Sequence, residues 1–125
     1  MRKEQDMDRQ DVIEKLLEYQ ATFEAEMHNL IRFAVAVPTA KWALEATKAK
    51  AIAAGQESGA LDGKNADERA QKLALWLEND AEVRRATNEL LNMECGVETH
   101  KANVEIARMG IRVLETVAKL LVAEP

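Results

Sequence analysis

Apolar residues recur at every seventh position through the first half of the chain, and a second row follows three residues behind. The first row is regular: Leu16, Phe23, Leu30, Val37, Leu44 and Ala51. The second row is interrupted by polar residues: Tyr19, Glu26, Phe33, Ala40, Thr47 and Ala54. Because positions three, four and seven apart share one face of an α-helix, the two rows predict one long helix. We expect this helix over residues 8–55, after frayed residues 1–7.

Pro38 lies inside this pattern, in the least polar stretch of the chain, "AVAVPTAKWAL". A proline in a helix removes one backbone hydrogen bond and strains the preceding turn, so it either breaks the helix or kinks it. The seven-residue spacing of Leu30, Val37 and Leu44 continues through it without a change of phase. The spacing therefore favours one continuous helix that is kinked at Pro38.

The middle of the chain carries turn and capping signals. The glycine-containing stretch "GQESGALDGKN" predicts a loop over residues 56–65. Asn65 and Glu68 have the three-residue spacing of a capping box, which predicts a short amphipathic helix over 66–78. Asp80 is a good capping residue and a poor mid-helix residue, so we expect a new helix to start at residue 81.

The last third of the chain has the cleanest heptad repeat. One row is Val83, Leu90, Val97, Val104, Ile111 and Ala118, and the other is Ala86, Met93, His100, Ala107, Leu114 and Leu121. Five heptads of this kind are typical of a coiled-coil helix, predicted here over residues 81–122. His100 is the one polar residue in the two rows. We interpret it as a polar core residue that sets the register, rather than as a metal ligand, pH switch or proton relay.

Two glycines flank this seam at an interval of two heptads. Gly96 and Gly110 have Asn103 midway between them, and each glycine costs about 1 kcal/mol relative to alanine in a helix. Small residues at these positions would let another helix approach closely. The alternative is sequence drift at exposed positions.

Together the elements predict an all-α, single-domain protein: a long antiparallel helical hairpin with a short middle helix. The first long helix is apolar on more than one face, because Ile31, Ala34, Val35 and Trp42 lie off its main row. Such a helix needs partners on two sides, and a homodimeric four-helix bundle would provide them. The predicted subunit interface comprises Leu30, Val35, Val37, Pro38, Trp42, Leu44, Val97, Val104 and Ile111.

Composition narrows the class of protein. The 125 residues are 47% hydrophobic, 31% charged and only 4% aromatic, with a formal net charge of −5. This charge does not favour general attraction to nucleic acid or to anionic membranes. There is one cysteine, Cys95, and there is neither a run of about 18 apolar residues nor a secretory signal pattern at the N-terminus. We expect a cytoplasmic protein that does not enter the membrane.

Motifs that carry chemistry are missing from the sequence. It has no glycine-rich phosphate loop and no pattern typical of a nucleophilic enzyme. The residues three positions before His28 and His100 are Ala25 and Val97, so the Glu-x-x-His motif of di-iron bundles is absent. We therefore predict no catalytic residues, no cofactor and no metal, and hence no enzyme.

A local excess of basic residues is the remaining candidate site. It consists of Arg32, Lys41, Lys48, Lys50, Arg84 and Arg85. In a dimer these residues would contact phosphates if they formed a stripe, but they are also typical of an ordinary solvated face.

The segment from Ala53 to Leu91 contains an alanine-rich helix ending in a glycine-containing turn, then Gly63, Lys64, Asn65 and Arg69, and then an Asp-x-Glu-Val start at residues 80–83. In these features it resembles small helical-hairpin proteins of phages and prophages. The resemblance implies a mobile-element origin, and it carries over no catalytic residues.

Four functions are compatible with these observations. The leading hypothesis is a non-enzymatic homo-oligomer that binds and modulates a partner protein, for example as an inhibitor of a host defence system. One alternative is an accessory of phage DNA replication or recombination that binds nucleic acid through the basic residues. Another is a small-ligand sponge that holds a nucleotide between subunits, around Trp42, Trp76 and Arg69. A purely structural scaffold is a further reading.

Overall fold

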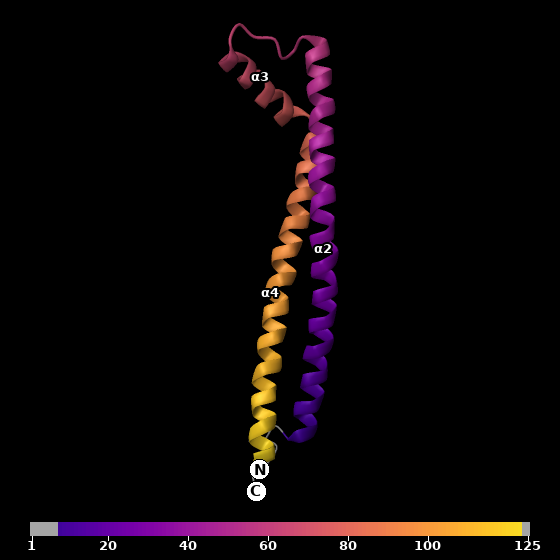
Figure 1. Ribbon diagram of the computed structural model, residues 1–125, viewed down its shortest axis with the longest axis vertical. Coiled ribbons are helices and arrows are strands. Elements are labelled where there is room, and N and C mark those ends of the chain that lie inside the picture. The colour runs from indigo at the N-terminus through magenta and orange to yellow at the C-terminus, as the bar shows by residue number, and fades with distance from the viewer. Residues whose placement is uncertain (1–7, 124–125) are drawn as a thin grey trace. The chain divides into compact units, whose positions relative to one another are not determined.

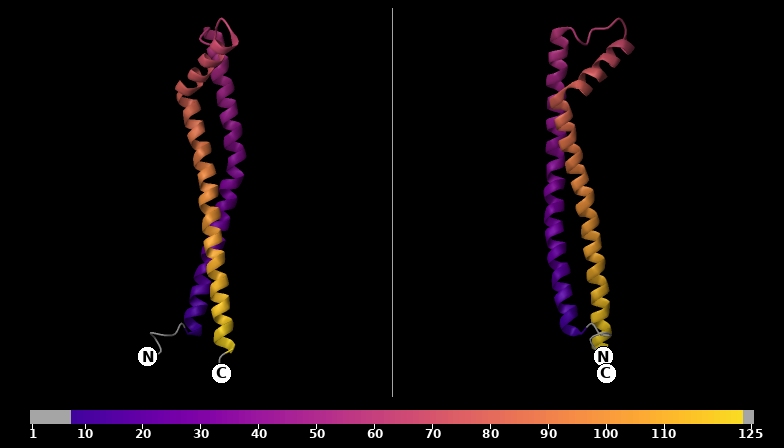
Figure 2. Two further views of the ribbon diagram at one scale, coloured as in Figure 1. Left: turned by 90° about the vertical axis from the view of Figure 1, so that its left-hand side faces the viewer. Right: turned by 180° about the vertical axis from the view of Figure 1, so that it is seen from behind.

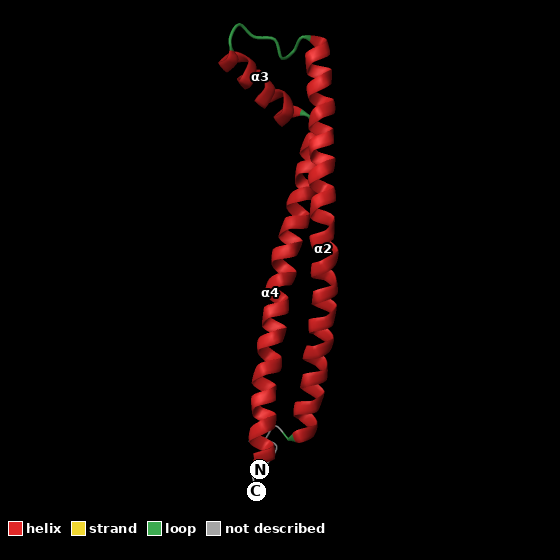
Figure 3. Cartoon of the chain, viewed as in Figure 1, coloured by secondary structure: helices red, strands yellow, loops and turns green. Residues whose placement is uncertain are grey.

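A computed structural model describes residues 8–123, and every regular element within them is a helix. The helices are α2 (Arg9–Ser58), α3 (Ala66–Asn79) and α4 (Ala81–Ala123) (Figure 3). The predicted all-α class is confirmed for this part of the chain. The frayed segment predicted over 1–7 lies outside the described residues.

The chain divides into two compact units, and α2 and α4 contribute to both. Unit 1 contains residues 8–32 and 97–123 of the described chain, and unit 2 is Phe33–Gly96. The single-domain organisation stays a prediction.

Helix α2 runs without interruption through Pro38 (Figure 1). The helix is therefore continuous rather than broken at the proline, and the predicted kink at Pro38 stays a prediction. The helix ends at Ser58, three residues beyond the predicted end at Gly55. Gly55 is buried inside the helix, where a Cβ atom would come within 2.9 Å of the side chains of Leu61 and Trp76.

Gly59, rather than Gly55, ends the helix. Its φ of 78° lies in the left-handed region that glycine adopts without steric cost. The amide of Gly59 donates to the carbonyl of Gln56 at 3.2 Å, and the amide of Ala60 donates to that of Gly55 at 3.0 Å. This pair of bonds is the Schellman arrangement, which satisfies carbonyls left free at the end of a helix.

The starts of α3 and α4 are capped by the residues that the sequence indicates. Asn65 Oδ1 accepts a hydrogen bond from the Glu68 amide at 2.8 Å, and Glu68 Oε2 accepts one from the Lys64 amide at 3.2 Å. Asp80 Oδ1 accepts from the Val83 amide at 2.9 Å. Side-chain oxygens thus satisfy amides that the first turns leave unpaired.

In unit 1 the segments of α2 and α4 lie side by side (Figure 2) and run antiparallel, since Tyr19 meets Gly110 while Glu26 meets His100. The seam buries Val12 of α2 and, from α4, Val104, Ala107 and Leu114.

Unit 2 has its own small core, to which all three helices contribute. Leu44 and Ala51 of α2 and Val83 of α4 are buried, and Trp76, Leu77, Ala86 and Leu90 pack against them. The indole nitrogen of Trp76 donates to the carbonyl of Ala51 at 2.6 Å. Helix α3 has no fully buried residue, and Trp76 and Leu77 are the two of its residues that pack against this core.

Candidate interaction surfaces

Each of the two flanking glycines of α4 lies against an aromatic ring of α2. In unit 1, a Cβ atom on Gly110 would be 2.5 Å from Cε1 of Tyr19. In unit 2, a Cβ atom on Gly96 would be 2.5 Å from Cδ1 of Phe33. The glycines therefore allow a close approach, and the helix that approaches is α2 of the same chain.

A polar cluster interrupts the seam of unit 1. His100 Nδ1 pairs with Glu26 Oε2, and both side chains are only 20% exposed. The hydrogen bond from His100 lowers the pKa of the Glu26 carboxyl below its usual value, and a hydrogen bond from Asn103 acts in the same direction. His100 thus lies in the seam, as its heptad position predicts, and its partner is a carboxylate from the second row of α2.

The lowered pKa of Glu26 predicts a pH-dependent contribution to stability. This contribution is complete above pH 4.5 and is lost as pH falls through the lower folded-state pKa. We expect Glu26→Gln to destabilise the protein near neutral pH, and the difference from wild type to shrink below about pH 4. Urea unfolding followed across pH measures this difference. The control is Glu24→Gln, at an exposed neighbouring position, and equal pH profiles for all three proteins would contradict the expectation.

The predicted interface residues separate into two groups. Leu44 and Val104 are buried within the chain, and Leu30, Val37, Val97 and Ile111 are half-buried. Packing within one chain therefore covers a large part of these six side chains. The other three, Val35, Pro38 and Trp42, are exposed.

These three exposed residues belong to a continuous face of α2 in unit 2. Val35 is 68% exposed and Trp42 is 79% exposed. The exposed residues Ala46 and Ala49 continue the face, because they lie four and seven positions after Trp42. We call Val35, Pro38, Trp42, Ala46 and Ala49 the Trp42 face.

A second exposed apolar face follows α4 in unit 1. Ile106, Met109, Val113 and Leu120 are each more than 60% exposed. Their spacing of three, four and seven residues places them on one side of the helix, away from the seam row that contains Val104. This face was not predicted, because the heptad row two residues earlier, which contains Val104, is the more regular of the two. The row starting at Ile106 could have been found by testing every heptad phase.

Within unit 2, two of the candidate phosphate contacts, Lys48 and Lys50, do not share one face of α2. Lys50 lies about 200° around the helix axis from Lys48, since each residue turns the helix by about 100°. Lys48 also pairs with Glu45 at 3.7 Å. Lys48 and Arg84 line one surface hollow of about 420 Å³ together with the acidic Glu78. The remaining members are exposed: Arg32, Lys41, Lys50 and Arg85.

The three residues of the ligand-sponge alternative have separate surroundings. Trp76 binds the Ala51 carbonyl, and Arg69 Nη1 donates to the Gly63 carbonyl at 3.2 Å. Both therefore hold α3 and its preceding loop in place, whereas Trp42 is exposed on α2.

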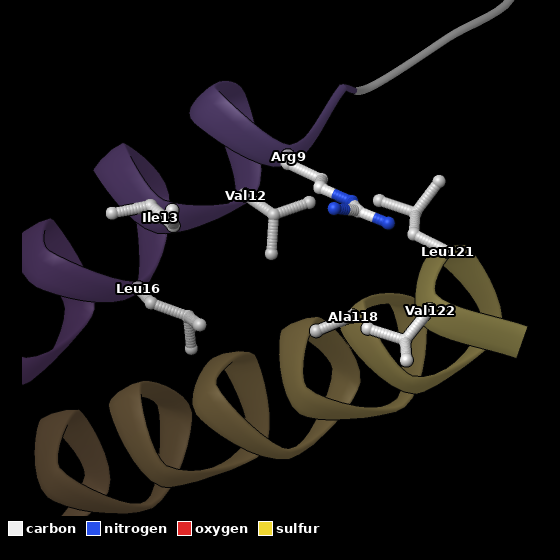
Figure 4. Close-up of a pocket in the computed structure, with 7 residues that line it drawn as sticks. All are labelled: Arg9, Val12, Ile13, Leu16, Ala118, Leu121 and Val122. Atoms are coloured by element: carbon white, nitrogen blue, oxygen red, sulfur yellow. The ribbon is translucent and has the colours of Figure 1, made fainter.

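A different hollow, of about 180 Å³, opens between the helices in unit 1 (Figure 4). Its lining is apolar except for one arginine: Arg9, Val12, Ile13, Leu16, Ala118, Leu121 and Val122. The lining offers a ligand little polar chemistry beyond that guanidinium.

Within residues 8–123, no three His, Cys, Asp or Glu side chains are grouped so that they could hold a metal ion. In the same range, none of the helices is both long and apolar enough to cross a bilayer. We compared the chain with protein-family models, curated proteins and solved structures, and it matches none of them. The resemblance to phage proteins consequently stays a prediction.

Proposed function

We propose that this chain is a non-enzymatic, homo-oligomeric helical protein that binds another protein and modulates it. The observation that carries the proposal is the Trp42 face, where a tryptophan that is 79% exposed follows an exposed valine and proline on one helix. Tryptophan is enriched among the residues that dominate binding energy in protein interfaces, because it buries a large apolar area when a partner covers it.

The shape of this face fits a helix of the partner. Ala46 and Ala49 follow Trp42 on the same side of α2 and project only methyl groups. Small side chains let two helices approach closely, while the neighbouring indole supplies an anchor for an apolar pocket. The proposed partner segment is therefore an amphipathic helix that packs its apolar side along α2.

The resemblance to phage proteins suggests the biological form of this binding. A small helical protein of a phage that acts on its host would bind a component of a host defence system and inhibit it. This specific form rests on the resemblance alone, whereas the binding face rests on the exposed residues of α2.

Trp42→Ala tests the proposal. We expect the variant to lose a protein partner that the wild-type chain retains from a bacterial lysate. An anchor of this kind is worth about 2 kcal/mol or more, which corresponds to at least about a thirtyfold weaker complex. The free energy of unfolding should change by less than about 0.5 kcal/mol, because the side chain is exposed. Affinity capture with mass spectrometry, followed by titration with the purified partner, measures both effects.

Lys41→Ala is the matched control, since Lys41 is an exposed neighbour on the same turn of α2. It should retain the partner. The proposal fails if wild type and Trp42→Ala retain the same proteins. A partner lost with Lys41→Ala and kept with Trp42→Ala would also contradict it, because binding would then depend on charge.

A further inference from the structure

The exposed face of α4 in unit 1 has the residue pattern of a coiled-coil seam. Its members follow one another at alternating steps of four and three residues: Ala102, Ile106, Met109, Val113, Thr116 and Leu120. Thr116 fits such a seam because its hydroxyl donates to the Arg112 carbonyl of its own helix at 3.1 Å. The polar atom is thereby satisfied inside the helix, so an apolar neighbour on this face strands no hydrogen-bond donor.

Charged residues along one edge of this face indicate what covers it. Glu98, Glu105, Arg112 and Lys119 are exposed and lie seven residues apart, and the last three directly precede the seam residues Ile106, Val113 and Leu120. Glu105 also pairs with Arg108 of the same helix at 2.6 Å. The edge is acidic in its N-terminal half and basic in its C-terminal half. Such a charge pattern is complementary to itself when it is turned end for end.

We propose that a second copy of this chain packs antiparallel on the α4 outer face, made up of Ala102, Ile106, Met109, Val113, Thr116 and Leu120. Ile106 then packs against Met109 of the second copy. In the same register Glu105 faces Arg112, and Glu98 faces Lys119, in both directions across a two-fold axis.

Other arrangements have fewer opposite-charge contacts than the four of this register. Sliding one helix by a heptad brings Arg112 opposite Arg112, or Glu105 opposite Glu105, depending on the direction, and leaves only two opposite-charge contacts, between Glu105 and Lys119 or between Glu98 and Arg112. A parallel pair sets Glu105 beside Gly110 of the second copy, where no charge is available. Because like charges across a seam are unfavourable and opposite charges fix the register, the pattern selects one antiparallel alignment.

The dimer rests on the homo-oligomer that is part of the proposed function, and the α4 outer face is the surface that forms it. Dimerisation does not depend on the Trp42 face. Sedimentation equilibrium of the full chain in low salt tests it. We expect a species of twice the chain mass, and we expect Glu105→Arg and Arg112→Glu each to raise the dissociation constant at least about tenfold. The double variant, which exchanges the two charges, should return the dissociation constant to within about threefold of wild type.

Glu115→Arg is the matched control, because this exposed residue lies about 200° around α4 from Val113 and should leave the dimer unchanged. Circular dichroism verifies that all variants remain helical. A wild-type monomer at about 100 μM would overturn the inference. Unchanged association of both single variants, or a double variant weaker than either, would overturn it as well.

Partner capture by the Arg112→Glu variant distinguishes dimerisation through the α4 outer face from partner binding through the Trp42 face. If the monomeric variant still retains the partner through Trp42, the dimer surface and the binding face are independent, as inferred. If wild type is monomeric and partner capture persists, the α4 surface is refuted while the binding face stands.

Discussion

Trp76→Ala is expected to lower the free energy of unfolding of unit 2 by about 3 kcal/mol, at the lower end for a tryptophan because the side chain is half-buried. The indole packs against the core formed by Leu44, Ala51 and Val83. It also donates a hydrogen bond to the Ala51 carbonyl at 2.6 Å. Helix α3 buries no residue completely, and only Leu77 joins Trp76 in packing against this core, so removal of the ring takes away one of its two contacts there.

Denaturant unfolding and hydrogen exchange of the α3 amides measure the effect. Trp76→Phe retains much of the ring volume and removes the indole donor, so its cost should be only about 1 kcal/mol. Trp42→Ala is the matched control, because it deletes the same side chain from an exposed position. Equal losses for Trp42→Ala and Trp76→Ala would contradict the expectation, and so would unchanged exchange of the α3 amides in Trp76→Ala.

Gly96→Leu is expected to destabilise unit 2 by about 2 kcal/mol, although leucine is the better helix former. A Cβ atom at this position would lie 2.5 to 2.8 Å from three ring atoms of Phe33, so the ring or the backbone has to move. Forcing extra carbon atoms into a packed contact costs about 1–3 kcal/mol, whereas the gain in helix propensity is below about 1 kcal/mol.

A double-mutant cycle with Phe33→Ala shows whether the aromatic ring is the cause. The double variant should be more stable than the sum of the single effects predicts, with a coupling energy of at least about 1 kcal/mol. Asn92→Leu, at an exposed position of α4, is the control for adding a leucine to the helix. Strict additivity of Gly96→Leu and Phe33→Ala would contradict the expectation.

Heptad periodicity was sufficient to predict the class of fold and the three helices. It worked because the seam rows, such as Val83 to Ala118, are regular and because Asn65 and Asp80 cap helices with side-chain oxygens. The end of α2 was placed at the wrong glycine. A glycine signals either a left-handed turn, as Gly59 does, or a close contact, as Gly55 does, and composition alone does not distinguish the two.

The interaction surfaces were predicted only in part. The apolar excess around Val35 and Trp42 was visible in the sequence, because these residues lie outside the seam rows. The seam residues Leu44 and Val104 were assigned to a subunit interface, yet packing inside one chain buries them. A heptad row indicates that a helix face is covered. It does not indicate whether the covering helix belongs to the same chain or to another.

The pairing of Glu26 with His100 could not be derived from the sequence. In the sequence, Glu26 is only a polar residue that interrupts a largely apolar row, and its partner is 74 residues away. Only the alignment of the two helices brings the carboxylate to the imidazole. That alignment also places Tyr19 on Gly110 in the same unit.

The connection between α2 and α3 has a consequence for the order in which the chain can fold. Arg69 reaches back six residues to the Gly63 carbonyl, and Lys72 Nζ reaches back ten to that of Asp62 at 2.5 Å. Bonds of such short sequence separation close small loops, and the entropy lost in closing a loop grows with its length. These two bonds of the connection are therefore local contacts. Pairings such as Glu26 with His100 close a far larger loop, and a connection that is already formed shortens the free chain between them.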